Sequence, residues 1–530
     1  MTARTARGVA AATLAAALIT GVAACSNPHP AGGGPADSAV VGIATEPESL
    51  SPLLGYGKDG NSKIFDGLLA HDAGMKLKPA LAEALPEVSA DGLAYTYKLR
   101  QGVKFSDGAP FSAKDVVFTY RTILDAKTNN ASKTELDAVA GVEARGEDTV
   151  VFTLKYPYAP FAERTVLPIA PEHIAGRQDV NSGDFATHPV GTGPYVLTGW
   201  SKGEKLSFKA NPGYWGGEPA VKRFTMAVIK DDDVRATRLR SGELDGAILP
   251  PNLAETFAKD AAREVLAAKT FDYRNVTLPT HHPVTGDVAV RRALDIAVDR
   301  EAMVDKLLEG AGKAAYGPVP TDSPWFTAGT ERPYDLDRAK RILDDAGWKS
   351  GEDGIRVKDG VRASFPLWYT SGDKIRQDHA LAFASDAKKA GIEVKAEAGT
   401  WEVIEPRMKT DAVLAGGGSP ADPDFDQYQL LTSSLGGDGF NNMARYENPA
   451  VDAALLDGRK SGDPAARKAA YDTVQRELVK DPGYVFLTHI DHLYVVNDKW
   501  EGLTTQVEPH DHGLGSGPWW NVESWKPKQK

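Results

Sequence analysis

The sequence predicts an α/β protein with more than one lobe. Short runs rich in β-branched and aromatic residues alternate with stretches of helical periodicity along most of the chain, and this alternation is typical of α/β folds. The chain has 530 residues, whereas a single hydrophobic core rarely serves more than about 250–300 residues. Apolar residues make up 42% and charged residues 25%, which is normal for a soluble globular protein. We therefore expect two or three α/β lobes.

Residues 1–24 have the layout of a secretory signal peptide. Arg4 and Arg7 precede an alanine-rich apolar stretch that is shorter than the roughly 20 residues of a membrane-spanning helix. The stretch ends at Val22–Cys25, where small residues are followed by the single cysteine of the chain. This run resembles the lipobox of bacterial lipoproteins, in which the cysteine thiol receives a diacylglycerol. We expect an exported protein anchored through Cys25 to the outer face of the cell membrane, on its periplasmic or extracellular side. An ordinary signal peptide with an incidental cysteine is the alternative.

Charge and cysteine content argue against several partners and bonds. The net charge of -11 disfavours a nucleic-acid partner, because neutralising phosphates requires clustered Lys and Arg. It also disfavours electrostatic adhesion to anionic lipid, so the acyl chains are expected to be the anchor. With Cys25 lipidated, the mature protein has no cysteine for a disulfide. Residues 25–37 are expected to carry the lipid and to form a flexible tether rich in Pro, Gly and Ser.

The expected strands are short and apolar. The first covers residues 39–43 and leads into a polar loop at residues 45–51. Further strands are expected at residues 95–99, 149–154, 224–229, 365–369 and 392–396.

The expected helices begin at residues that can cap them. Ser112 starts a capping box, and Asp463 precedes a proline at the first helical position. Asp287 is expected to cap a helix whose apolar positions run through residues 290–307, and Asp335 to cap another. Strands and helices thus mix along the whole chain, as in α/β lobes.

Five ordered segments of the chain carry distinctive motifs. The first segment includes Leu-Arg-x-Gly-Val-x-Phe-x-Asp-Gly at residues 99–108. The segments are Leu77–Val117, Pro189–Tyr195 with Asn211–Trp215 and Leu239–Asp245, Asp287–Arg300, Tyr334–Trp348, and Asp422–Asp424 with Arg445–Asp452 and Arg467–Tyr471.

Together these segments resemble one family, the oligopeptide-, dipeptide- and nickel-binding proteins of bacterial ABC importers (extracellular solute-binding protein family 5). The match runs from about Val40 to about Trp500, which is nearly the whole mature chain. Most of these motifs also have a plain role in turns and caps, so they identify the fold rather than the ligand contacts.

The resemblance implies a periplasmic-binding-protein-like fold of type II (cluster C), with two α/β lobes joined by a hinge and an extra domain. It also implies that a monomer captures a small ligand, most often a short peptide, between its lobes and delivers it to ABC permease subunits. A metal chelate, an opine-like compound or an oligosaccharide is the alternative cargo, and no cofactor is expected. The implied division is lobe I at residues 38–64, 188–270 and 486–530, the extra domain at 65–187, and lobe II at 271–485.

The resemblance also points to ligand-binding residues. Family pockets are lined by the loop after the first strand and by aromatic and polar residues of lobe II. Each aromatic residue of this set also has a simpler interpretation as part of the core. The candidates are Glu46, Tyr316, Tyr369, Ser371, Trp401, Ser419, Asp422 and Asp424.

Ser419 is the most informative departure from the family pattern. Peptide binders of this family carry an acidic residue three positions before the Asp-Pro pair, where it pairs with the peptide's α-amine. A hydroxyl cannot neutralise a buried ammonium, and an unpaired buried charge costs several kcal/mol. Either Asp422 or Asp424 takes over this role, or the cargo has no free amine there.

Neither a bound metal nor catalysis is expected. Asp422, Asp424 and Asp426 resemble the start of a calcium loop, but Gln427 and Ser433 occupy the positions where such a loop needs Gly and Glu. The histidine pairs lack the spacing of a zinc helix, so a metal is expected only as chelated cargo. The rival class, a secreted lipoprotein hydrolase, would need a nucleophile elbow of the form G-x-S-x-G, and the runs at Gly418-Ser419 and Gly515-Ser516 lack that spacing.

Overall fold

The computed structural model describes residues 37–130, 133–510 and 514–528. The predicted signal peptide, Cys25 and the tether up to residue 36 lie outside these residues. In the ranges described, no helix is both long enough and apolar enough to cross a membrane.

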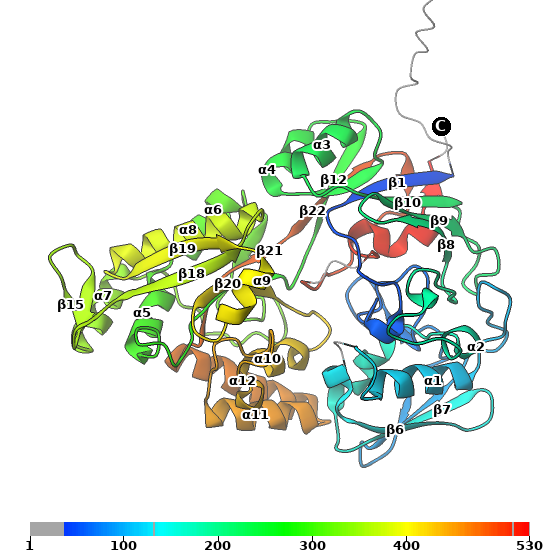
Figure 1. The fold of residues 1–530 in the computed structure, drawn as a ribbon, viewed down its shortest axis with the longest axis horizontal. Helices are drawn as coiled ribbons and strands as arrows, with labels where there is room; N and C mark the ends of the chain where they lie inside the picture. The colour runs from blue at the N-terminus through cyan, green and yellow to red at the C-terminus, as the bar shows by residue number, and fades with distance from the viewer. Residues whose placement is uncertain (1–36, 131–132, 511–513, 529–530) are drawn as a thin grey trace, which may run out of the picture.

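The first lobe is built on a seven-stranded sheet with its earliest strand near the centre (Figure 1). β1 (Ser38–Ile43) pairs in parallel with β10 and β11, and the other pairs of this sheet are antiparallel. α3 (Asp232–Arg240) packs on one face, after Asp231 caps its N-terminus, and α4 (Pro251–Ala254) lies beside it. The sheet order is β12 (Arg263–Ala268), β22 (His492–Asn497), β11 (Gly246–Leu249), β1, β10 (Arg223–Val228), β9 (Lys205–Ala210) and β8 (Tyr195–Ser201).

The second lobe contains a six-stranded sheet with helices on both faces. One core lies between the sheet and α5, α7 and α8, and a second lies between the sheet and α10, α11 and α12. The sheet order is β14 (Gly312–Ala314), β21 (Tyr484–Ile490), β13 (Tyr273–Thr277), β20 (Ala412–Gly417), β18 (Ser364–Thr370) and β19 (Glu393–Gly399). The helices are α5 (Val288–Ala297), α6 (Arg300–Leu307), α7 (Leu336–Asp345), α8 (Lys374–Lys389), α9 (Trp401–Ile404), α10 (Pro423–Leu431), α11 (Pro449–Lys460) and α12 (Pro464–Lys480).

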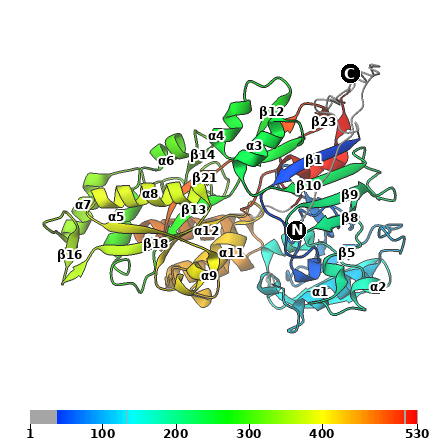
Figure 2. The ribbon, with the colours of Figure 1, turned by 45° about the horizontal axis from the view of Figure 1, so that its top comes forward.

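The extra domain has an antiparallel four-stranded sheet against which α1 (Ala113–Leu124) packs. It lies below the first lobe and beside the second in Figure 1, and Figure 2 shows the same neighbours. Its core is continuous with that of the first lobe, so we treat these two parts as one body. The sheet order is β4 (Glu87–Val88), β5 (Ala94–Lys98), β7 (Thr149–Leu154) and β6 (Val139–Ala144), with β2 (Leu69–His71), β3 (Leu77–Pro79) and α2 (Glu172–Ala175) nearby.

The smaller strands complete the fold. β15 (Lys349–Ser350), β16 (Arg356–Lys358) and β17 (Val361–Arg362) form a three-stranded sheet at the far end of the second lobe, and β23 (Trp500–Glu501) pairs with β24 (Lys526–Pro527) in the first lobe.

The capping residues predicted from the sequence begin helices in the structure. Ser112 forms its capping box with Asp115, and the Asp463 side chain accepts a hydrogen bond from the backbone of Ala465. The single helix expected after Asp287 is wrong, because it divides into α5 and α6. Val298 between them has an extended backbone, and Asp299 caps α6.

The chain crosses between the two lobes at adjacent places. One crossing joins β12 to β13, and the other joins β21 to β22 with Asp491 alone between the strands. The expected division placed residues 486–490 in lobe I, but β21 pairs with β13 and β14 in the second lobe. These residues therefore belong to the second lobe, because the buried strand continues to Ile490 before the chain crosses. The other boundaries stay a prediction.

Candidate functional site

Adjoining cavities follow the loop after β1, where the two lobes and the extra domain meet. The hinge cavity, about 220 Å³, lies between Thr45 and the Ile248–Pro251 segment of the first lobe and Arg274 and Ile375 of the second. The loop cavity, about 420 Å³, is lined by residues 45–49 and shares Thr45 with the hinge cavity. Together with the narrow cavity described next, they form what we call the interlobe cleft.

The narrow cavity lies where the extra domain approaches the second lobe. It is lined by Arg164 and Glu163 of the extra domain and by Ser419 and Phe425 of the second lobe. Lys58, Asp59 and Asn61 line both this cavity and the loop cavity, so the cleft is continuous along the loop.

Two of the predicted ligand residues, Glu46 and Ser419, lie on this cleft. Glu46 is held by its own lobe, since its carboxylate accepts hydrogen bonds from Trp200 Nε1 at 2.7 Å and from the Gly203 backbone at 2.6 Å. Ser419 is half-buried in the narrow cavity, on the segment between β20 and α10. The structure thus brings both lobes' candidates to one cleft, and their contact with ligand stays a prediction.

Asp422 is already paired within the second lobe. Its side chain caps α10, and its two oxygens accept a bidentate pair of hydrogen bonds from Arg467 at 2.9 and 2.7 Å. This use accounts for its full burial without any ligand.

Asp424 joins the second lobe to the extra domain. It accepts a hydrogen bond from the Tyr158 hydroxyl at 2.8 Å and lies 3.4 Å from Arg459 Nε. Burial raises the pKa of Asp424 to about 6 even though Arg459 favours its charged form. Its role as a substitute amine anchor stays a prediction.

The four other candidates lie outside the cleft. Tyr369 is buried in the core of the second lobe, whereas Ser371 is exposed after the end of β18. The ring of Trp401 packs edge-on against Phe440, with centroids 5.2 Å apart, and the guanidinium of Arg300 lies 5.2 Å from the ring of Tyr316. Among the described residues that line the three cavities, none of Tyr316, Tyr369, Ser371 and Trp401 occurs. An aromatic residue at a strand end has the same sequence pattern whether it faces the core or a pocket.

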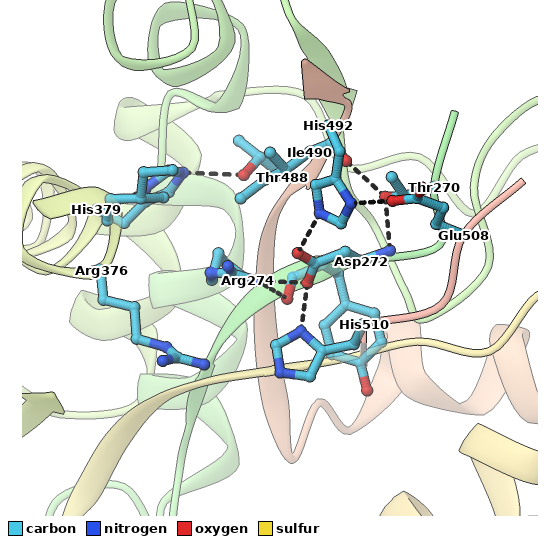
Figure 3. A network of polar contacts seen from close by, with 12 residues as sticks. Thr270, Asp272, Arg274, Arg376, His379, Thr488, Ile490, His492, Glu508 and His510 are labelled. Carbon is cyan, nitrogen blue, oxygen red and sulfur yellow. Dashed lines mark hydrogen bonds and ion pairs between the residues drawn. The ribbon is translucent and has the colours of Figure 1, made fainter. Parts of the chain in front are cut away.

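A buried charged network crosses the hinge, and Figure 3 shows its members. Asp272, fully buried, lies 3.1 Å from His492 Nε2 and 2.6 Å from His510 Nδ1, and it pairs with Arg274. His492 reaches Glu508 with its other ring nitrogen at 2.5 Å. The network therefore connects the second lobe, through Asp272 and Arg274, to strand β22 and the C-terminal segment of the first lobe.

The pKa shifts of Asp272 and His492 both favour the charged forms of these two side chains. Burial alone would raise the pKa of Asp272, but Arg274 and His510 lower it well below its ordinary value. Burial alone would lower the pKa of His492, but its hydrogen bonds with Asp272 and Glu508 raise it to about 9. His492 is thus a cation between two carboxylates at neutral pH.

Sequence reasoning missed this network. Asp272 and Arg274 flank the start of an apolar strand, which is a weak signal because charged residues also end strands at surfaces. His492 and His510 were considered only as metal ligands. Over the residues that the structure describes, no group of three His, Cys, Asp or Glu side chains is arranged to hold a metal ion.

Comparison with known proteins gives the chain its family. The model of bacterial extracellular solute-binding proteins, family 5 (Middle), matches residues 76–439. Protein XP55 of Streptomyces lividans is 67% identical over 94% of this chain and 93% of its own length. The oligopeptide-binding protein AppA of Bacillus subtilis is 29% identical over 91% of both chains.

Solved structures agree with this assignment. NikZ from Campylobacter jejuni, in complex with Ni(L-His), superposes with a TM-score of 0.84 at 30% identity, covering 93% of this chain and 100% of that one. AppA from Bacillus subtilis, in complex with a nonapeptide, gives a TM-score of 0.80 at 28% identity, covering 93% and 99%. The expected type II binding-protein fold is thereby confirmed, and these relatives are extracytoplasmic solute-binding proteins rather than enzymes. The chain belongs to the bacterial extracellular solute-binding proteins of family 5.

Proposed function

We propose that this chain is the lipid-anchored capture component of an ABC importer, which encloses a short peptide in the interlobe cleft and delivers it to a membrane permease. The observation that carries the proposal is that the hinge cavity and the narrow cavity each have walls from both bodies, which are joined at a hinge, and that the loop cavity of the first body connects the two. Hinged closure around a ligand shifts an equilibrium between open and closed forms, and the closed form is then what a permease can recognise.

A peptide is favoured because the cleft offers both polar and apolar walls along its length. The hinge cavity includes Ile248, Leu249 and Trp519, whereas the loop cavity includes Glu46 and Lys58. Extended peptides need such mixed surfaces, because side chains of different chemistry leave the backbone in alternate directions. AppA, one of the structural relatives, was solved with a nonapeptide.

The narrow cavity offers acidic groups near Ser419 for a peptide amine. Glu163 and Asp59 line the same cavity as Ser419. Glu163 lies 2.7 Å from His71, and burial raises the pKa of its carboxyl. A peptide ammonium placed here would favour the ionised form of Glu163 and would not depend on the hydroxyl of Ser419.

A nickel chelate is the second candidate cargo. NikZ, solved with Ni(L-His), is a close structural neighbour, and His492 lines the hinge cavity. Both ring nitrogens of His492, however, already face Asp272 and Glu508, so a metal bond to His492 would have to break one of these contacts. We therefore rank peptides first, ahead of nickel chelates, opine-like compounds and oligosaccharides.

Two experiments test the proposal. The protein is produced from residue 26 onward and keeps all ten tryptophans of the sequence. It is mixed with peptides, saccharides and nickel chelates. Intrinsic fluorescence and small-angle scattering should then show closure with peptides of defined length. If no peptide changes either signal while chelates or saccharides do, the peptide cargo is wrong.

The lipid anchor is tested separately in cells that export the full chain. Labelled palmitate should enter the wild-type protein and should be absent from Cys25→Ser, which should appear in the soluble fraction. Equal membrane retention of both proteins would contradict anchoring through Cys25.

A further inference from the structure

The extra domain and the second lobe exchange arginines where they meet. Arg164, on the 3₁₀ helix Ala159–Val166 of the extra domain, places its guanidinium carbon 3.4 Å from the ring centroid of Phe425 on α10. Arg459, on α11, places its guanidinium carbon 4.9 Å from the ring centroid of Tyr158 in the extra domain. Each body thus presents a cation to an aromatic ring of the other, and the ring's quadrupole attracts that cation.

Phe425 is an apolar side chain of one body that is buried in the core of the other. By sequence it belongs to the second lobe, but it packs in the core that the first lobe shares with the extra domain. Among the described residues, neither of the cores on the two faces of the second-lobe sheet includes it. Separation of the two bodies would expose this ring to water, so its burial favours the arrangement in which they touch.

The charge of Arg459 is shared between one carboxylate of each body. Its Nε lies 3.4 Å from Asp424 in the second lobe, and its Nη2 lies 3.7 Å from Asp137 in the extra domain. The Tyr158 hydroxyl donates a hydrogen bond of 2.8 Å to the other oxygen of Asp424. The contact therefore joins a ring, two carboxylates and a guanidinium group across the boundary.

Arg164 is held in position by its own body. Glu135 accepts hydrogen bonds from Arg164 Nη1 and from Lys58 Nζ, the latter at 2.6 Å. All three residues lie in the first lobe or the extra domain, so this orientation of Arg164 does not require the second lobe. A side chain that is already oriented loses little further rotamer freedom when Phe425 arrives.

Most of this contact is separate from the surfaces offered to cargo. We call its five residues the clasp. Among the described residues that line the three cavities of the cleft, Tyr158, Asp424 and Arg459 do not occur, whereas Arg164 and Phe425 line the narrow cavity alone. The clasp is a contact between protein groups, so it can form before any solute binds. Its residues are Tyr158 and Arg164 of the extra domain and Asp424, Phe425 and Arg459 of the second lobe.

We propose that the extra domain serves as a clasp for the second lobe, and that the clasp populates the closed arrangement without cargo, alongside the open one. Cargo then completes the shift toward the closed form. The proposal rests on the proposed function in one respect, because it concerns closure about the same hinge. It assigns the extra domain a role in closure that does not depend on which solute is carried.

The test measures closure in the absence of any solute. The protein from residue 26 onward contains no cysteine, because Cys25 is the single one of the chain. Leu85→Cys in the extra domain and Leu456→Cys on α11 therefore accept the only two spin labels, at positions that are 53% and 41% exposed. α11 lies beside the extra domain (Figure 1), so opening should lengthen this distance. Double electron–electron resonance of the ligand-free protein should show a short-distance population together with a longer one.

Two variants remove one contact of the clasp from opposite bodies. Arg164→Gln and Phe425→Ala should each lower the ratio of short to long distances about tenfold, as expected for the loss of a buried cation–π contact. Arg407→Gln is the matched control, because its guanidinium carbon lies 4.9 Å from the ring centroid of Trp368 within the second lobe. It should leave the distance distribution unchanged.

Three outcomes overturn the clasp. They are a ligand-free wild type without the short-distance population, a wild-type distribution in Arg164→Gln or Phe425→Ala, or an equal effect of Arg407→Gln. If one of the two clasp variants fails to fold, the other still decides, since the two substitutions lie in different bodies.

Failure of the proposed function would look different. The ligand-free distances would respond to the clasp variants as described, while no solute changed them. If peptides do close the lobes, Tyr158→Phe should raise their dissociation rate constant about tenfold without slowing association, because the lost hydrogen bond stabilises only the closed form. Slower association with an unchanged dissociation rate constant would overturn the assignment of Tyr158 to the clasp.

Discussion

Tyr158 of the extra domain donates a hydrogen bond of 2.8 Å to Asp424 of the second lobe, 266 residues further along the chain. Both side chains are buried, and Arg459 lies against the Tyr158 ring as well as beside Asp424. Because the extra domain shares its core with the first lobe, this contact spans the two bodies that a hinge motion would separate. It therefore stabilises the arrangement in which the two bodies touch.

Tyr158→Phe should weaken that contact. A hydrogen bond to a charged group contributes about 1.5–3 kcal/mol. Each 1.4 kcal/mol of lost stabilisation should lower the ratio of closed to open molecules about tenfold. Scattering of the ligand-free protein should show a larger radius of gyration. Tyr156→Phe is the matched control, since its hydroxyl bonds Asp137 within the extra domain. Equal dimensions of Tyr158→Phe and the wild type would contradict the role of this contact.

Stability should fall at high pH because of His492. Its folded-state pKa is raised from 6.5 to about 9, so its contribution is complete below about pH 6.5 and is lost as the pH rises through 9. The gap in melting temperature between wild type and His492→Gln should therefore shrink between pH 7 and pH 10. His188→Gln, at an exposed position, should follow the wild type throughout. A gap that is constant over this range would show that the His492 charge does not contribute.

The stability of the folded protein should also fall at low pH, because of Asp272. Its folded-state pKa lies well below the ordinary 3.8, so its contribution is present above about pH 4 and is lost as the pH falls through the folded value. Asp272→Asn should remove this acid sensitivity and should be less stable than the wild type at pH 6. Urea unfolding of both proteins at pH 6 and pH 3 measures both effects. They would be contradicted if Asp272→Asn were less stable than the wild type by the same amount at the two pH values.

Gly416→Ala should destabilise the hinge. An added Cβ would lie 2.6 Å from Cε1 of His510 and 2.9 Å from Nη1 of Arg274, and overpacking of this kind costs about 1–3 kcal/mol. Gly199→Ala in β8 is the control, because no atom lies within 4 Å of its added Cβ. Thermal unfolding compares the two variants, and equal melting temperatures would refute the close packing at Gly416.

Ser419→Asp tests whether a peptide amine reaches the narrow cavity. An added carboxylate there should strengthen the binding of a tripeptide with a free amine, by about tenfold for 1.4 kcal/mol of added attraction. The N-acetylated tripeptide should gain nothing. Calorimetric titration distinguishes the two, and an equal change for both peptides would place the amine elsewhere.

The features that depend on local sequence were predictable. Ser112 and Asp463 cap helices through bonds within three residues, so the sequence pattern alone identifies them. The break between α5 and α6 was not predictable. Its apolar periodicity continues across Val298, and the extended backbone there depends on packing with α8, whose Asp386 accepts a hydrogen bond from the Asp299 backbone.

In the candidate site, too, the features that depend on local sequence were predictable and those that depend on distant contacts were not. Glu46 was predicted from its place in the loop after the first strand, and that loop lines the cleft. Asp422 was also chosen from a motif, but its partner Arg467 is 45 residues away, and local sequence does not indicate that the two side chains pair. Arg274 and Asp272 were missed because a charged residue beside an apolar strand has the same signature at a surface and at a buried hinge.

The single residue between β21 and β22 limits how the protein can move. With Asp491 as the whole connection, and a second crossing of four residues beside it, any rearrangement must be absorbed by a few backbone torsions. A sliding motion of one lobe past the other would break the hydrogen bonds of the paired strands on either side. The permitted motion is a rotation of one body relative to the other about one fixed axis. The lobes must therefore close along the same path around every cargo that fits.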